Sequence, residues 1–131
     1  QQEGDYKDGI EVDNSEVDET LIPVAFPKLS NISLLADGFQ SGIKVRRGAK
    51  ISLNNILIDN FDIGIEIEGT LSNQFFENGE SDVNDLNIIN SNNMFQVDNP
   101  NIESIILNAS NNSSNGCGNS YGQGWMLNWT K

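Results

Sequence analysis

The sequence predicts an all-β protein, folded as a right-handed parallel β-helix of about four coils. The first observation is a short motif, Gly-Ile-x-[Val/Ile], which occurs at residues 9–12, 42–45 and 64–67. The second is the pattern between these motifs, where apolar residues rich in β-branched types alternate with polar ones, as in strands. The third is that no segment of about ten residues shows helical spacing. Parallel strands at a regular period stack as coils, and their crossover connections are right-handed.

A repeat of about 22 residues sets the expected register of the central coils. When residues 28–47 are aligned with residues 50–69, Leu34 falls on Ile56 and Phe39 falls on Phe61, and the rings of these two phenylalanines are expected to stack. A weaker copy of the motif follows at residues 94–97, and residues 105–108 are expected to form the last strand.

The same alignment separates inward from outward positions of the coils. The residues expected to point inward are Ile43, Val45, Ile65 and Ile67. On the outer face, Lys44 is expected opposite Glu66. Two residues further along, Arg46 is expected opposite Glu68. The first copy of the motif offers Glu11 and Asp13 at the same two places, so the expected columns are Glu-Lys-Glu and Asp-Arg-Glu. Facing opposite charges contribute roughly 0.2–1 kcal/mol per pair, so these columns are expected to fix the register of the coils.

Two parts of the chain differ from the coils. Residues 1–108 are expected to form the coils, with residues 13–20 as an acidic loop, and residues 109–131 to form a polar linker and a C-terminal cap. The cap contains Trp125 and Trp129, and terminal coils of a solenoid need such a cover.

Composition and charge exclude several classes of function. The chain has 131 residues, with 7 basic and 19 acidic residues and a net charge of −12, so we expect no nucleic-acid partner. It has no histidine and a single cysteine, Cys117, which removes Ser-His-Asp catalysis, His-based zinc sites and internal disulfides. No apolar run approaches 18 residues, so no membrane span is expected. No signal peptide is recognisable at Gln1, and we expect a mature or internally cut start.

The motifs at residues 9–14, 27–34, 42–48 and 60–65 together resemble a recurring pattern of uncharacterised, secreted or lipid-anchored β-helix proteins of Bacteroidota. The resemblance covers about residues 5–70; the tail at residues 125–130 only approximates the W-T-x-G-W-T ending of that family. It implies a pectate-lyase-like right-handed parallel β-helix located outside the cell or on the outer-membrane surface of a Gram-negative bacterium. It also implies that the chain is the C-terminal portion of a longer β-helix. No activity comes with the resemblance.

Three groups of residues are candidate binding sites. Lys44, Arg46 and Arg47 lie in a basic segment and could hold an anionic group, although a structural ladder is the favoured interpretation of these residues. Trp125 and Trp129 could form a platform for a sugar or, alternatively, a hydrophobic cap. The candidate calcium ligands, which carry the hard oxygen atoms that Ca²⁺ prefers, are Asp8, Glu11, Asp13 and Asn14.

Further polar residues are expected to order the turns. Asp37 and Asp59 are expected to cap their own turns, and Asn60 and Asn90 are expected to form side-chain ladders between coils. No residue is assigned a catalytic role.

The sequence therefore predicts a non-enzymatic cell-surface or secreted module that acts in binding or as part of an outer-surface assembly. Its partners would be preceding coils of the same β-helix, another surface protein or a polysaccharide. Two alternatives remain: part of a carbohydrate-active enzyme of the polysaccharide-lyase type, and a calcium-stabilised adhesin-like repeat. Because a coil that begins at Ile10 would leave an uncovered edge, we do not expect a free monomer.

Overall fold

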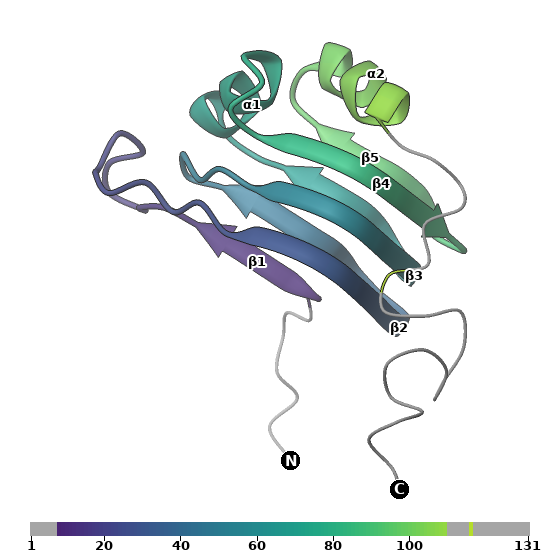
Figure 1. Ribbon diagram of the computed structural model, residues 1–131. Helices are drawn as coiled ribbons and strands as arrows, with labels where there is room; N and C mark the ends of the chain where they lie inside the picture. Colours follow the sequence, from purple (N-terminus) through teal and green to yellow (C-terminus); the bar gives the residue numbers. More distant parts are fainter. Residues whose placement is uncertain (1–7, 110–115, 117–131) are drawn as a thin grey trace, which may run out of the picture.

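The computed structural model describes residues 8–109 and residue 116 of the chain. Its elements are the strands β1 (Ile10–Asp13), β2 (Lys28–Arg46), β3 (Ser52–Ile67), β4 (Asp82–Ile89) and β5 (Asn93–Val97), and the helices α1 (Thr70–Glu77) and α2 (Pro100–Ala109). Every strand pair is parallel. The sheet follows the order β1-β2-β3-β4, and β5 also pairs with β3. The resulting curled sheet of stacked strands is shown in Figure 1.

Each of the long strands β2 and β3 is bent and supplies two walls of one coil. The first wall is the N-terminal part of the strand (residues 28–35 of β2 and 52–59 of β3), and the second wall is the C-terminal part (residues 39–46 of β2 and 61–67 of β3). The first wall of the β3 coil pairs with β4, and the second wall pairs with β5, so β4 and β5 together form the next coil. Parallel pairing throughout, with a crossover between successive coils, fits the parallel β-helix that the repeat predicts. The right hand of the turn and the number of four coils stay predictions.

The core confirms the expected inward positions. The four residues predicted to point inward are all buried: Ile43, Val45, Ile65 and Ile67. They pack in one cluster with the apolar side chains of the first walls and of the two helices.

A glycine begins the repeated motif because two walls approach each other closely at that place. A Cβ atom on Gly42 would lie 2.5 Å from Cγ2 of Ile58, which belongs to the first wall of the next coil. The corresponding Cβ on Gly64 would lie 2.7 Å from Ile88. Real Cβ atoms are not found at such distances, so only glycine allows the side chains of one coil to fill the bend of its neighbour.

The 22-residue register is correct for the second wall and wrong for the first. Phe39 pairs with Phe61 and Ile43 with Ile65, as expected. In the first wall, however, Lys28 pairs with Ser52, and Leu34 pairs with Ile58 instead of Ile56. The reason is an irregularity between Leu35 and Phe39, where β2 contains extra residues relative to β3 and its register therefore shifts.

Two helices correct the prediction of a chain made only of strands and turns. Helix α1 lies between β3 and β4 and buries Phe76. Helix α2 forms where residues 105–108 were expected to be the last strand. Its apolar residues Ile102 and Ile106 are fully buried, which is the i, i+4 spacing of one helix face. The contacts of α2 with β4, β5 and α1 place it over the last coil (Figure 1).

Candidate functional site

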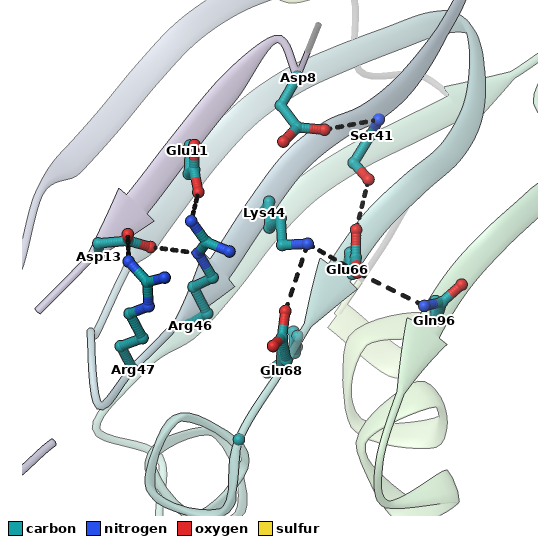
Figure 2. A network of polar contacts seen from close by, with 12 residues as sticks. Asp8, Glu11, Asp13, Ser41, Lys44, Arg46, Arg47, Glu66, Glu68 and Gln96 are labelled. Carbon is teal, nitrogen blue, oxygen red and sulfur yellow. Dashed lines mark hydrogen bonds and ion pairs between the residues drawn. The ribbon is translucent and has the colours of Figure 1, made fainter. Parts of the chain in front are cut away.

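The outer face of the second walls carries a ladder of charged side chains, shown in Figure 2. Backbone register stacks four residues, one from each coil: Glu11, Lys44, Glu66 and Gln96. Beside this column, Asp13 of β1 pairs with Arg46 of β2. We call these side chains, together with Asp8, Ser41, Arg47 and Glu68, the charged ladder.

Lys44 occupies the middle of the charged ladder. Its Nζ lies 3.0 Å from Oε1 of Glu66 and 3.3 Å from Oε2 of Glu68, and its side chain is largely buried. Burial acts to lower the pKa of Lys44, but the hydrogen bonds and charges of Glu66 and Glu68 outweigh it and raise this pKa. The expected pairing of Lys44 with Glu66 is confirmed.

Glu66 is a carboxylate that is almost completely buried, and it is held by three partners. Besides the contact from Lys44, the Oγ of Ser41 donates to its Oε2 at 2.6 Å. The Nε2 of Gln96 also donates to its Oε1 at 3.4 Å. A buried carboxylate is tolerated when it is paired and hydrogen-bonded in this way.

Arg46 lies beside one of its two expected neighbours, Asp13, and does not contact the other, Glu68, in an ion pair. It faces back to the preceding coil: its Nε lies 2.8 Å from Oδ1 of Asp13, and its guanidinium also contacts Glu11. The hydrogen bond to Asp13 is the main cause of a raised pKa for Arg46. Glu68 contacts Lys44 instead, because β3 ends at Ile67 and the strand ladder does not hold Glu68 opposite Arg46.

Arg47 completes this end of the charged ladder. Its Nη1 lies 2.7 Å from Oδ2 of Asp13, so the two oxygens of one carboxylate serve two arginines. All three basic candidates for anion binding, Lys44, Arg46 and Arg47, thus have carboxylate partners. An anionic ligand would have to displace one of these partners, and ligand binding by the three stays a prediction.

The four candidate calcium ligands have other partners in the structure. Asp13 and Glu11 contact arginines, and Oδ1 of Asp8 accepts a hydrogen bond from the backbone of Ser41 at 3.0 Å. The side chain of Asn14 spans the acidic loop, donating to the carbonyls of Glu19 and Leu21. Within residues 8–109 and 116, no three acidic or cysteine side chains are grouped to hold a metal ion. Calcium binding stays a prediction.

The contacts found for Asp59, Asn60 and Asn90 run between coils, and the turn cap expected at Asp37 stays a prediction. Asp59 was expected to cap its own turn, but its Oδ1 accepts a hydrogen bond from Nδ2 of Asn90 at 2.8 Å. Asn60 donates to the carbonyl of Ala36 at 2.9 Å, so Asn60 and Asn90 link coils without pairing amide to amide. The amide-to-amide contact in the structure joins Asn55 to Asn31 at 2.8 Å.

Several predictions fall outside what the structure describes. Trp125, Trp129 and Cys117 lie in residues 117–131, and the side chain of Phe39 is also outside the description, so its expected stacking on Phe61 stays a prediction.

The N-terminal side of the stack has an edge that β1 covers only in part. β1 pairs with the second wall of β2, from Ile43 to Arg46, and within residues 8–109 no strand pairs with this edge of the first wall. We call residues 28–35 of β2 the open edge, meaning that no described strand pairs with it. The backbone of Gly116 lies against this edge, since a Cβ atom on Gly116 would be 2.3 Å from the carbonyl oxygen of Ile32. The apolar side chains of the open edge, Leu29, Ile32 and Leu34, are only partly buried. Their partners in the next coil, which share the same columns, are 0% exposed: Leu53, Ile56 and Ile58.

The fold and the ladder define a class of protein, a parallel β-helix module whose second walls carry a ladder of mutually paired charges. The sequence model of the family described as "Pectate-lyase like beta helix domain" matches residues 1–130, and the chain belongs to that family. No curated protein matches the chain, and no solved structure does. Within the described residues, neither helix is long and apolar enough to cross a membrane.

Proposed function

We propose that this chain is a non-enzymatic β-helix module that ends a stack of coils and joins it to further coils through the open edge. The observation that carries the proposal is the difference between its two ends. Over the last coil, Ile102 and Ile106 of α2 are fully buried. At the other end, Leu29, Ile32 and Leu34 remain partly exposed in columns that are closed one coil further down.

A location outside the cell, secreted or on the outer surface of a Gram-negative bacterium, is part of this proposal. It is supported by the resemblance of residues 5–70 to secreted and lipid-anchored β-helix proteins. The partner would be a preceding coil of the same β-helix, with another surface protein as the alternative source. Unpaired strand edges template association, so natural proteins cover them, and the open edge has the strand geometry that needs such cover.

The charged ladder supports a structural role over a catalytic one. General acid–base catalysis needs a group whose proton can exchange with a substrate, and the carboxylate that is most buried here, Glu66, is held by Lys44, Ser41 and Gln96. Arginine and lysine side chains with raised pKa values remain protonated and do not serve as bases. The enzyme alternative therefore lacks a specific observation in its favour.

Size-exclusion chromatography with light scattering on residues 1–131 tests the proposal. Because no strand of the described residues pairs with the open edge, we expect concentration-dependent association above the 14.4 kDa of one chain. A lysine at the edge should prevent this, so Ile32→Lys should return the chain to a monomer. Ile105→Lys, at an exposed position of α2, is the matched control. A wild-type chain that stays monomeric at all concentrations would contradict the proposal.

A further inference from the structure

The segment between β1 and β2, residues 14–27, exposes several large apolar side chains, and we call it the β1–β2 loop. Val17 is 96% exposed and Ile22 is 80% exposed. Leu21 and Phe26 of the same loop are also exposed. Figure 1 shows the loop, in purple and blue, projecting beyond β1. Single exposed apolar residues are ordinary on a protein surface, whereas a group of them in one short segment indicates an interaction site.

The side chain of Asn14 holds the β1–β2 loop in one conformation. Its Nδ2 donates to the carbonyl of Glu19 at 3.1 Å and to that of Leu21 at 3.0 Å. Its Oδ1 accepts a hydrogen bond from the backbone of Ala25 at 3.0 Å. A turn inside the loop is closed by the backbone of Leu21, which donates to the carbonyl of Asp18 at 3.1 Å. The exposed side chains are therefore presented by an ordered backbone.

Two glycines allow the loop to lie along the side of the stack. A Cβ atom on Gly48 would overlap the carbonyl oxygen of Glu19, and one on Gly69 would lie 2.9 Å from Oε1 of the same residue. Gly48 follows β2 and Gly69 follows β3, so the loop reaches the turns of the next two coils. It thus extends toward the C-terminal end of the stack, away from the open edge. A coil added at the open edge does not account for the exposure of Val17 and Ile22.

Order without burial is the property that points to a partner. Fixing the conformation of a loop costs conformational entropy, and exposed apolar side chains recover little of that cost inside the chain. A surface that is already ordered binds more tightly than a flexible one, because less entropy is lost on association. The hydrogen bonds of Asn14 and the exposure of Val17 and Ile22 together have the form of a preorganised binding loop.

The charges around these apolar side chains indicate what the partner carries. Residues 8–27 contain six acidic residues and no basic one. The side chain of Glu16 is 78% exposed. Asp18 is also exposed, and the hydrogen bonds from Thr20 lower the pKa of its carboxyl group, so it is ionised at neutral pH. Such a surface attracts a cationic partner and repels an anionic one.

We propose that the β1–β2 loop binds a protein partner through a short segment in which apolar side chains are flanked by lysine or arginine. The apolar side chains would cover Val17, Leu21 and Ile22, and the basic ones would lie beside Glu16 and Asp18. Each side of a standard protein interface supplies about 20–30 residues, more than this loop contains, so the occupant is a short segment and not a globular face. The inference goes beyond the proposed function and does not depend on the open edge.

Two other occupants fit the loop less well. A second copy of the chain would carry the same acidic loop and a net charge of −12, so the two copies would repel each other. Loops that insert apolar side chains into an anionic membrane surface rely on Lys and Arg for attraction to the headgroups, and residues 8–27 contain neither.

Peptide selection on the complete chain of residues 1–131 tests the proposal. A phage-displayed library of random peptides, about 12 residues long, is selected on the immobilised chain, and the affinity of the enriched peptides is then measured by fluorescence anisotropy. The double variant Val17→Ser with Ile22→Ser removes the apolar contacts. The double variant Ile105→Ser with Leu107→Ser, at exposed positions of α2, is the matched control. Because all four positions are exposed, the melting temperature should stay close to that of the wild type in both.

We expect the selection to enrich peptides with an apolar centre flanked by Lys or Arg. Val17→Ser with Ile22→Ser should weaken their binding about tenfold or more, whereas the α2 control should change it by no more than about twofold. Glu16→Lys should weaken binding about threefold or more, because it places a like charge beside the basic residues of the peptide. Added salt should also weaken binding, since the charges involved are exposed.

Three results would overturn the proposal. The first is a selection that enriches no peptides of the basic and apolar type. The second is equal affinity of the enriched peptides for the wild type and for Val17→Ser with Ile22→Ser. The third is flotation of the wild type, but not of that double variant, with vesicles of phosphatidylcholine or of phosphatidylcholine and phosphatidylserine, which would assign the loop to a lipid surface. All three leave the open edge untouched, so the proposed function is tested separately by the oligomeric state.

Discussion

Replacing Lys44 with Met tests whether the charged ladder holds the coils together. Met keeps much of the length and apolar stem of Lys44 but removes the ammonium group that contacts Glu66 at 3.0 Å and Glu68 at 3.3 Å. Breaking a buried ion pair costs about 3–5 kcal/mol, whereas an exposed pair contributes about 0.2–1 kcal/mol. In Lys44→Met, the almost completely buried Glu66 would still accept hydrogen bonds from Ser41 and Gln96. Glu68 is exposed, so the loss of its ion pair should cost little. We therefore expect a loss of about 2–3 kcal/mol in the free energy of unfolding at pH 7.

The pH dependence gives an independent check. Because the folded-state pKa of Lys44 is raised above its ordinary value of 10.5, its contribution is complete below that pH and is lost as the pH rises through the raised pKa. The difference in unfolding free energy between the wild type and Lys44→Met should therefore shrink in alkaline solution above that pH. Urea unfolding at pH 7 and at several alkaline pH values measures it.

Two controls make this test specific to the pair. Lys28→Met removes an exposed lysine that lies 5.5 Å from the ring of Phe26, and it should change stability by no more than about 0.5 kcal/mol. Adding Glu66→Met to Lys44→Met removes the carboxylate left without its cation and should recover most of the loss. A loss for Lys44→Met no greater than that of Lys28→Met, unchanged with pH, would refute a structural role for the ladder.

Two further substitutions test the bend and the cap by urea unfolding. Gly42→Ala would place a Cβ atom 2.5 Å from Ile58 and should cost about 1–3 kcal/mol or more, whereas Gly38→Ala meets no atom within 4 Å and should cost only the strain of its positive φ, about 1 kcal/mol. Equal losses would mean that close approach is not the reason for glycine in the motif. Ile106→Ala should cost about 2–5 kcal/mol because its side chain is fully buried, whereas Ile105→Ala, 40% exposed and on the same helix, should stay within about 0.5 kcal/mol. Similar losses at the two positions would show that α2 does not seal the last coil.

The second wall could be predicted from the sequence because its signal is local and repeated without interruption. Gly42 and Gly64 mark the same bend, and every second residue after them, namely Ile43, Val45, Ile65 and Ile67, is a buried apolar residue of the core. A one-residue slip there would turn Ile43 and Val45 outward, so the pattern leaves only one register. The charges on the opposite face, Lys44 and Glu66, then follow without further information.

The remaining features depend on contacts that local pattern does not contain. Helix α2 was missed because Ile105 and Ile106 continue the β-branched composition of the strands, and only burial against the last coil selects the helical form. Of the two neighbours expected for Arg46, Asp13 was correct and Glu68 was wrong, although both are acceptable by charge. The choice depends on where β3 ends, and element boundaries are set by tertiary contacts.

In the first wall, the irregularity of β2 between Leu35 and Phe39 conceals the true register from a sequence alignment. The 22-residue alignment is plausible for the first wall because it places Asp37 on Asp59. The residues that share a backbone conformation, a positive φ, are instead Asn31, Asn55 and Asp85. The extra residues of β2 between Leu35 and Phe39 displace the first wall by a small step, enough to align polar turn residues with the wrong partners. Residues with a positive φ align the coils without this ambiguity, because only a few residue types accept that conformation in any coil. In this chain the column of positive φ at Asn31, Asn55 and Asp85 therefore specifies the register of the first wall, as the bend glycine specifies that of the second.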